Sequence, residues 1–322
     1  MDTKLVTAPL TVDKAGMPKN ALAGEIAVVT GGSSNIGLGI SRSLAWLGAK
    51  VVIASRTPSL GTAAAEFINK ESGAGSALFV STDVGDEASM KNMARRAFDT
   101  FGKVDILANN AMDMSLAAPI LKTSVAQMDR QYEIAVRGTL LGIQFFVPGM
   151  KDRKHGVVTF LSTAFRYPMG PSNYCAAKSS ACSMLMSLAN ELGPVKDSGI
   201  AVFTFLPTSV NRRSAVPPGP RDFIVAHSMP GYEGSIPPED CGAAMAYCIH
   251  RAADIHGSGI MIGQAFRQMK WPFPKPETVP TKDYDRINET ALSLMFGYMG
   301  PGFPDPIVPL VSINRKDGVP RP

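Results

Sequence analysis

Tyr174 and Lys178 lie four residues apart in a stretch, Asn173 to Lys178, whose pattern predicts a helix. This spacing places both side chains on one helical face. A free phenol, with a pKa of about 10, is a poor acid or base at neutral pH, but a neighbouring ammonium group favours the phenolate and lowers that pKa. The pair is therefore suited to proton transfer. Because such pairs also occur by chance, its meaning depends on the elements that position it.

A turn rich in glycine and serine lies upstream of this pair. The apolar run from Ile26 to Thr30 predicts a strand, and the pattern from Ile36 onward predicts a helix. Small residues in such a turn let the backbone approach a phosphate, and the following helix offers unpaired N–H groups. The turn lacks G-x-G-x-x-G in register, and an ordinary βα turn without a ligand is the alternative. The predicted pyrophosphate contacts are Gly31, Ser33, Ser34, Asn35 and Ile36.

Three motifs occur in a characteristic order: Thr30-Gly31-x-x-x-x-Ile36-Gly37, Asn109-Asn110-Ala111 and Tyr174-x-x-x-Lys178. Together they resemble the short-chain dehydrogenase/reductase family, over roughly residues 22 to 265. The resemblance implies an α/β fold with a doubly wound, Rossmann-type parallel sheet and NAD(H) or NADP(H) as cofactor. It implies that Tyr174 gives or takes the proton while hydride moves to or from nicotinamide, and that Lys178 also binds the nicotinamide ribose. Cofactor contacts are further expected from Asp83, Val84, Asn110 and Val210, although Asp83 could equally cap the next helix.

Apolar runs and helical patterns alternate along the chain, as in a parallel sheet of about seven strands. The carboxyl ends of the strands, where such sheets bind ligands, should converge on one crevice. We expect strands near 26–30, 50–55, 77–81, 104–108, 156–161, 199–205 and 259–262. We expect helices near 36–48, 61–71, 87–101, 124–151, 173–193 and 238–252.

The end of the second strand predicts which nicotinamide cofactor binds. A carboxylate there would hydrogen-bond the 2′-hydroxyl of NAD and repel a phosphate. The chain has Ser55 and Arg56 instead. A hydroxyl beside a guanidinium suits a 2′-phosphate, so NADP(H) is favoured; the alternative is that Arg56 is a solvated surface residue.

The chain departs from the family pattern at several positions. Asn35 replaces the second glycine of the phosphate turn, a change that we expect to be harmless because asparagine tolerates left-handed backbone conformations better than most other residues. Met112 replaces the glycine after Asn109-Asn110-Ala111, where it either shapes the substrate pocket or fills the core. Ala135 replaces an asparagine that, in many family members, holds a water of the proton relay, and alanine cannot hold that water. Either another group completes the relay, the lysine exchanges protons with solvent directly, or catalysis is slow or absent.

The catalytic hydroxyl has two candidates. Strand register favours Thr163, whereas residue identity favours Ser162, which we expect to hydrogen-bond the substrate carbonyl, with Thr163 as its substitute. A lid at about 208–238 is expected to cover the substrate, and its Arg212 could pair with an anionic group or face water.

Three parts are expected along the 322 residues: an N-terminal extension, 1–21; the nucleotide-binding domain, 22–270; and a C-terminal extension, 271–322. The last part holds 10 of the 25 prolines, with one helix expected near 283–296. Its apolar content predicts that it packs over the substrate crevice or a neighbouring subunit.

Composition excludes several classes of function. The net charge is +5 with scattered basic residues, so we expect no nucleic-acid partner. No run of 18 apolar residues and no secretory segment occur, which predicts a cytoplasmic protein without a membrane partner. The spacing of the four histidines predicts no metal site, and Cys175, Cys182, Cys241 and Cys248 are expected to be buried free thiols. The long helices predict a homodimer or homotetramer by family resemblance.

We therefore expect an NADP(H)-dependent oxidoreductase that acts on a carbonyl or secondary alcohol of a moderately large, partly apolar small-molecule substrate. One alternative is reduction of the C=C bond of an enoyl or dienoyl thioester, since the family supports both reactions. The other is a catalytically silent NADP-binding sensor or assembly subunit.

Overall fold

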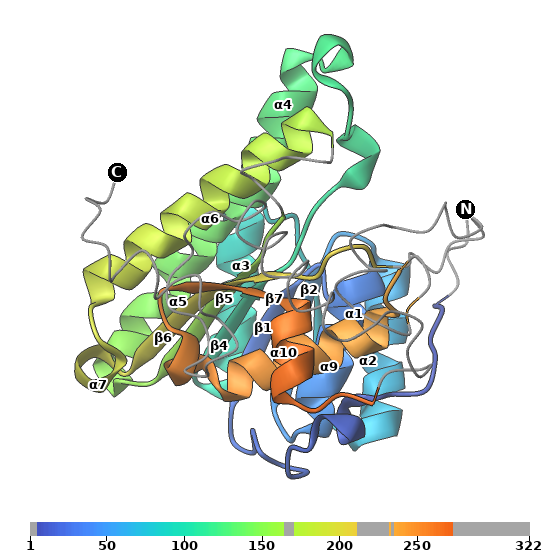
Figure 1. The fold of residues 1–322 in the computed structure, drawn as a ribbon, viewed down its shortest axis with the longest axis vertical. Coiled ribbons are helices and arrows are strands. Elements are labelled where there is room, and N and C mark those ends of the chain that lie inside the picture. Colours follow the sequence, from blue (N-terminus) through green and yellow to red (C-terminus); the bar gives the residue numbers. More distant parts are fainter. Residues whose placement is uncertain (1–4, 164–170, 211–231, 233–234, 273–322) are drawn as a thin grey trace, which may run out of the picture.

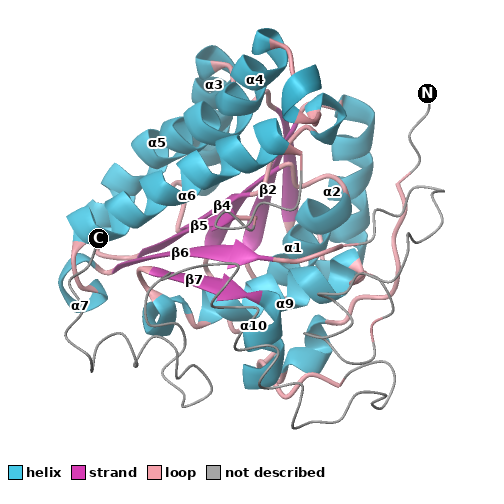
Figure 2. Cartoon of the chain, turned by 45° about the horizontal axis from the view of Figure 1, so that its top comes forward, coloured by secondary structure: helices cyan, strands magenta, loops and turns pink. Residues whose placement is uncertain are grey.

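Seven parallel strands form one sheet in the computed structural model, which describes residues 5–163, 171–210, 232 and 235–272. The strand order is β3-β2-β1-β4-β5-β6-β7 (Figures 1 and 2). The order reverses between β1 and β4, and ligands of such sheets bind at this switch point. The strands are β1 (Ile26–Thr30), β2 (Lys50–Ser55), β3 (Ala77–Ser81), β4 (Ile106–Asn109), β5 (Gly156–Leu161), β6 (Ile200–Leu206) and β7 (Ser258–Met261).

Helices cover both faces of this sheet (Figure 2). One apolar core lies under α1 (Asn35–Trp46), α2 (Pro58–Ser72) and α9 (Pro238–His250). The other lies under α3 (Glu87–Phe101), α5 (Gly138–Arg153) and α6 (Ser172–Leu192). With both faces covered, the central strands are apolar almost throughout, and every residue of β1 and β6 is buried. The shorter helices are α4 (Val125–Tyr132), α7 (Val195–Ser198) and α10 (Ile262–Gln268), and the 3₁₀ turns are Val12–Ala15, Met114–Leu116, Ile120–Lys122 and Ala252–Ile255.

The predicted α/β fold and parallel sheet are confirmed, and most boundaries agree within two residues. The single helix predicted at 124–151 is wrong, because α4 and α5 are separated by a π-helical segment, Glu133–Arg137. There the Thr139 hydroxyl donates to the carbonyl of Ala135 at 2.7 Å. π-segments are rare and occur as single turns inside otherwise α-helical stretches, so the sequence from 124 to 151 was interpreted as one helix.

Other boundaries shift for local reasons. The helix predicted from residue 61 begins at Pro58, which supplies a fixed φ and needs no N–H partner in the first turn. The strand predicted to end at 262 ends at Met261, and α10, which was not predicted, follows at once. The helix predicted near 283–296 lies outside the described residues.

The described part of the predicted N-terminal extension packs onto the domain. Val12 and Met17 are buried in the core shared by α1 and α9. Buried Arg42 of α1 links this segment to the helices, because its guanidinium donates to the carbonyl of Ala8 and pairs with Glu71 and Glu239. The segment thus contributes to the stability of the sheet and the helices that cover it.

The four cysteines are buried free thiols, as predicted. Among the described residues, none of the helices is long and apolar enough to span a membrane.

Candidate active site

A pocket opens at the carboxyl edge of the sheet, beyond the ends of β1, β2, β3 and β4. Its empty space, counted out to the open mouth, is about 590 Å³. The lining includes the predicted cofactor residues Gly31, Ser33, Ser34, Ser55, Arg56, Asp83 and Val84, together with Met112. The structure therefore brings together residues as far apart in the sequence as Gly31 and Met112, which are 81 positions from each other.

The turn between β1 and α1 forms one wall of this pocket. Gly31 has φ +67°, and a Cβ there would lie 2.8 Å from Nδ2 of Asn110. A Cβ on Gly37 would lie 2.1 Å from the carbonyl oxygen of Gly31. Asn35 adopts φ +46°, as its residue type permits, and starts α1. Protein atoms already fill the space that a side chain at Gly31 or Gly37 would need, so the two glycines let the turn, β4 and α1 pack together. The start of α1 beside them offers N–H groups of the kind that bind a phosphate.

Asn110 fixes the end of β4 to this turn. Its side-chain nitrogen donates to the carbonyl oxygens of Thr30 at 2.8 Å and Gly31 at 3.3 Å. The Thr30 hydroxyl accepts from the backbone N–H groups of Asn110 and Ala111, at 3.0 and 3.1 Å. The second predicted motif therefore stabilises the first.

Ser55 and Arg56 lie at the end of β2, next to this turn. The buried Ser55 hydroxyl accepts from the N–H of Ser33 at 3.2 Å. The Arg56 side chain is 49% exposed, and its Nη2 donates to Oδ2 of Asp113 at 2.7 Å. Asp113 also accepts from Ser115, from its N–H at 3.0 Å and from its hydroxyl at 2.6 Å. Burial alone would raise the pKa of Asp113, but the hydrogen bonds from Ser115 and Arg56 hold it below its usual value.

Asp83 and Val84 line the pocket beyond β3. Arg130 of α4 pairs with the Asp83 carboxylate and, at 2.9 Å, with Glu133, while the N–H of Gly85 donates to Asp83 at 3.0 Å. The alternative that Asp83 caps α3 is wrong, because Asp86 accepts from the N–H of Ser89 at 2.7 Å and occupies the cap.

Tyr174 and Lys178 share one face of α6, further along the carboxyl edge, at β5. The Lys178 ammonium donates to the carbonyl of Leu161 and lies 4.6 Å from the centroid of the Phe160 ring and 5.8 Å from that of Tyr174. Lys178 is 1% exposed. Burial lowers the pKa of Lys178 to about 8, an effect that neighbouring Cys182 opposes. Tyr174 is half-buried, and the two residues do not line the pocket described above.

Buried Asn173 fixes the start of α6 beside Tyr174. Its amide donates to the carbonyl of Leu116 at 2.7 Å and accepts from the N–H groups of Ala118 at 3.1 Å and Tyr174 at 2.9 Å. The segment after β4 is thereby tied to the helix that carries the proposed acid/base pair.

The two candidate hydroxyls differ in exposure. Ser162 is 2% exposed, and its oxygen lies beside the thiol of Cys182 without a conventional hydrogen-bond partner in the described part of the chain. Thr163 is half-buried. Both residues follow Leu161, the last residue of β5, and Thr163 is the more exposed of the two.

The remaining candidates lie around these groups. Ala135 is buried in the π-helical segment, next to Ile134, which lines the pocket. Val210 forms an isolated parallel bridge with Ile236 beyond β6. Arg212 lies outside the described residues.

The sequence did not predict Asp113, Arg130 or Asn173 as part of this region. Asp113 follows Met112 directly after the strand-end motif, and Asn173 directly precedes Tyr174. Their positions beside these motifs could have drawn attention to Asp113 and Asn173. The sequence does not indicate the three residues' distant partners, which lie 47 to 57 positions away.

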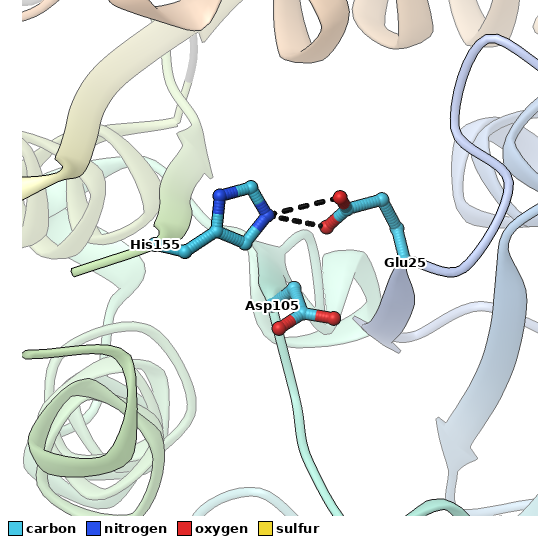
Figure 3. A group of neighbouring side chains, drawn as sticks. All are labelled: Glu25, Asp105 and His155. Atoms are coloured by element: carbon cyan, nitrogen blue, oxygen red, sulfur yellow. Dashed lines mark hydrogen bonds and ion pairs between the residues drawn. The ribbon is translucent and has the colours of Figure 1, made fainter. Parts of the chain in front are cut away.

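In the described part of the chain, one cluster of side chains has ligand atoms close enough together to hold a metal ion (Figure 3). It lies at the opposite, amino edge of the sheet. It comprises Glu25, Asp105 and His155, which precede β1, β4 and β5. The His155 ring nitrogen lies 2.9 Å from both Glu25 oxygens. Asp105 is fully buried and already pairs with Lys103 at 2.8 Å and Arg153 at 3.2 Å, so cationic side chains balance its charge.

Known proteins share this sequence pattern and fold. The family model described as short chain dehydrogenase matches residues 25–216. An uncharacterized oxidoreductase of Thermotoga maritima is 34% identical over 173 residues, which are 53% of this chain and 66% of that protein. The chain thus spans about two thirds of the length of this curated relative.

Solved structures agree with this assignment. A 7α-hydroxysteroid dehydrogenase in complex with NADH and 7-oxoglycochenodeoxycholic acid has a TM-score of 0.66 and 23% identity, covering 76% of this chain and 94% of that one. A short chain dehydrogenase from Burkholderia cenocepacia in complex with NADP has a TM-score of 0.62 and 24% identity, covering 75% and 97%. At these identities the structures establish the fold. The chain belongs to the short-chain dehydrogenase family and is an oxidoreductase of that family.

Proposed function

We propose that this protein transfers hydride between NADP(H) and a carbonyl group or secondary alcohol of a moderately large, partly apolar substrate. One observation carries the proposal: Tyr174 and the buried ammonium of Lys178 share a face of α6, along the same sheet edge as a pocket with Ser55 and Arg56 at its rim. The neighbours with NADH and with NADP show that this fold accepts either cofactor, so the preference for NADP(H) rests on Ser55 and Arg56.

The residues present fit a dinucleotide phosphate. The backbone of Gly31 and the start of α1 at Asn35 would hold the pyrophosphate, since Gly31, Ser33 and Ser34 line the pocket and, among the described residues, no side-chain cap occupies the first N–H groups of α1. Asp83 and Val84 would contact the adenine, and Ser55 and Arg56 the 2′-phosphate. When bound, the nicotinamide supplies or accepts the hydride.

Lys178 would act on both the cofactor and Tyr174. An ammonium carries three donors, and the carbonyl of Leu161 accepts one of them, which leaves donors for the ribose hydroxyls. With a pKa of about 8, Lys178 is still mostly protonated at pH 7. Its positive charge would stabilise the phenolate of Tyr174 when Tyr174 gives its proton to the carbonyl oxygen of the substrate.

Thr163 would orient the carbonyl. A hydroxyl that donates to the substrate oxygen stabilises the negative charge that develops on it. Because Ser162 is buried beside Cys182 and Thr163 is more exposed, we favour Thr163 for this role over Ser162. Met112 lines the same pocket as Ser55, Arg56 and Asp83, and its side chain would limit the size of the groups that bind there.

Reduction of a C=C bond in an enoyl or dienoyl thioester is the second candidate. The buried methyl group of Ala135 favours it, since an alanine cannot hold the relay water that ordinary carbonyl reduction uses in the family. Turnover of enoyl thioesters without turnover of ketones would establish this alternative.

The test is titration with NADPH and NADH, followed by hydride-transfer assays on a panel of ketones, aldehydes and enoyl thioesters. Tyr174→Phe is expected to retain NADPH binding and to lose about 10²–10⁴-fold in kcat on a ketone. Tyr132→Phe, which removes an exposed hydroxyl that contacts Ser180, is the control and keeps its rate. NADPH binding without turnover of any substrate would instead support the silent NADP-binding module.

We also propose a homodimer or homotetramer that buries α4, α5 and α6. Apolar side chains on this side of the molecule are exposed in the single chain: Val125 is 78%, Leu140 40% and Tyr132 36% exposed. A monomer in light scattering at micromolar concentration would contradict this proposal.

A further inference from the structure

Arg56 is the single cationic side chain among the described residues that line the pocket. A 2′-phosphate bound there would depend on its guanidinium. In the structure, Asp113 already holds that guanidinium, with Nη2 and Oδ2 2.7 Å apart.

The ion pair reaches across the pocket. Arg56 follows β2 and Asp113 follows β4, and β1 lies between these strands in the sheet. The two side chains therefore meet above the end of β1, next to the turn that carries Gly31. Arg56 lines the pocket and its guanidinium contacts the Asp113 carboxylate, so the carboxylate lies next to the pocket without being part of its lining.

Asp113 is held in position independently of Arg56. Its other oxygen accepts from the N–H and the hydroxyl of Ser115. When Arg56 leaves, the Asp113 carboxylate keeps both hydrogen bonds and its partial exposure, 18% of the side chain. Release of Arg56 therefore leaves the Asp113 carboxylate hydrogen-bonded to Ser115 and partly in contact with solvent, and the loss of this partly exposed ion pair costs little free energy.

We propose that Asp113 determines cofactor preference by competing with the 2′-phosphate for Arg56. NADPH must take Arg56 from Asp113, whereas NADH, which lacks the phosphate, leaves the ion pair in place. Asp113 thus weakens the preference for NADPH over NADH. This inference rests on the proposed NADP(H) specificity.

The test compares the dissociation constants for NADPH and NADH in wild type, Asp113→Asn, Arg56→Gln and the double variant. Asn keeps an oxygen for Ser115 but removes the charge that holds Arg56. Asp113→Asn is expected to tighten NADPH binding about two- to fivefold, the range for a partly exposed ion pair, and to leave NADH unchanged. Arg56→Gln is expected to weaken NADPH binding about tenfold or more, toward the affinity for NADH.

The double variant separates competition from a general charge effect. If Asp113 acts through Arg56, Asp113→Asn has no effect on NADPH binding when Arg56 is already Gln. The same gain in both backgrounds would mean that Asp113 only repels the phosphate, and would overturn the proposal. Asp99→Asn is the matched control: Asp99 pairs with Arg95 at 3.1 Å on α3 and does not line the pocket, so NADPH binding stays unchanged.

The remaining outcomes separate this inference from the proposed function. If Arg56→Gln weakens NADPH binding but Asp113→Asn does not tighten it, the competition is overturned and the NADP(H) preference stands. If Arg56→Gln leaves the ratio of NADPH to NADH affinity unchanged, both proposals are overturned.

Discussion

The two edges of the sheet carry ion pairs made from similar residues in different surroundings. At the amino edge, Asp105 is fully buried, accepts from the N–H of Ile26 at 3.0 Å and pairs with Lys103 and Arg153. At the carboxyl edge, Asp113 pairs with Arg56, which is half exposed at the rim of an open pocket.

This difference separates groups that hold the fold from groups available to a ligand. The groups that contact Asp105 at the amino edge all belong to the protein, and the hydrogen bond from Ile26 ties the start of β1 to the residue before β4. Losing one of these contacts therefore lowers the free energy of unfolding. At the carboxyl edge, the half-exposed pair contributes little to stability and can be exchanged. The same chemistry is therefore structural at one edge and exchangeable at the other.

The largest expected effect on kcat comes from substituting Lys178 at the carboxyl edge. Lys178→Met is expected to reduce kcat about 10²–10⁴-fold, because Tyr174 loses its neighbouring charge. The variant is nevertheless expected to be more stable at pH 7, by about 1–3 kcal/mol, because it removes a buried charge whose pKa is about 8. Steady-state kinetics and urea unfolding measure the two effects.

The lowered pKa of Lys178 also determines how the stability of the protein changes with pH. Below about pH 8 both folded and unfolded chains hold the Lys178 proton, and the folded state bears the full cost of burying it. Between about pH 8 and the ordinary value of 10.5 the folded chain has released the proton while the unfolded chain keeps it, so stability rises with pH. Lys178→Met lacks this rise. Lys103→Met, the control at the amino edge, is expected to lose stability and keep its kcat.

A large effect on stability is expected at the amino edge. Asp105→Ala leaves the buried N–H of Ile26 without its acceptor and two cations without their carboxylate, which is expected to cost about 3 kcal/mol of unfolding free energy. Glu25→Gln, in the more exposed pair with His155, is expected to cost less than about 1 kcal/mol. Urea unfolding measures both, and NADPH affinity should be unchanged. If Asp105→Ala loses NADPH affinity at temperatures where it is folded, the amino edge also affects cofactor binding, and the proposed difference between the two edges is wrong.

A smaller effect is expected from the two hydroxyls at the end of β5. Thr163→Ala is expected to lower kcat about 10- to 100-fold, whereas Ser162→Ala changes kcat less than about threefold, because the Ser162 hydroxyl is buried beside Cys182. Kinetics of both variants on the same ketone decide between them. The opposite order would restore Ser162 as the catalytic hydroxyl.

Sequence patterns predicted the strands well because apolar runs buried on both faces leave a strong local signal, as at β1 and β6. The turn at Gly31 and the pair Tyr174 and Lys178 were also local, since their spacing depends on one turn or one helix. These predictions needed no knowledge of distant partners.

Partners that lie far apart in the sequence could not be predicted. Nothing near Arg56 indicates that it meets Asp113, or that Asp83 meets Arg130. The cluster of Glu25, Asp105 and His155 forms only because β1, β4 and β5 are neighbours in the sheet. The π-helical segment around Ala135 was missed because it is a single rare turn within a stretch that is otherwise α-helical.

The attachment of Asn110 to the turn at Thr30 and Gly31 has a consequence for how the chain folds. The strand before Asn110, β4, pairs with β1 only after β2 and β3 have been synthesised. The contact from Asn110 to Thr30 therefore closes a loop of about 80 residues, and long-range contacts of this kind form slowly. A nascent chain that ends before β4 lacks the side chain that fixes the turn. We therefore expect nucleotide affinity to arise late in synthesis, when the fourth strand has docked beside the first.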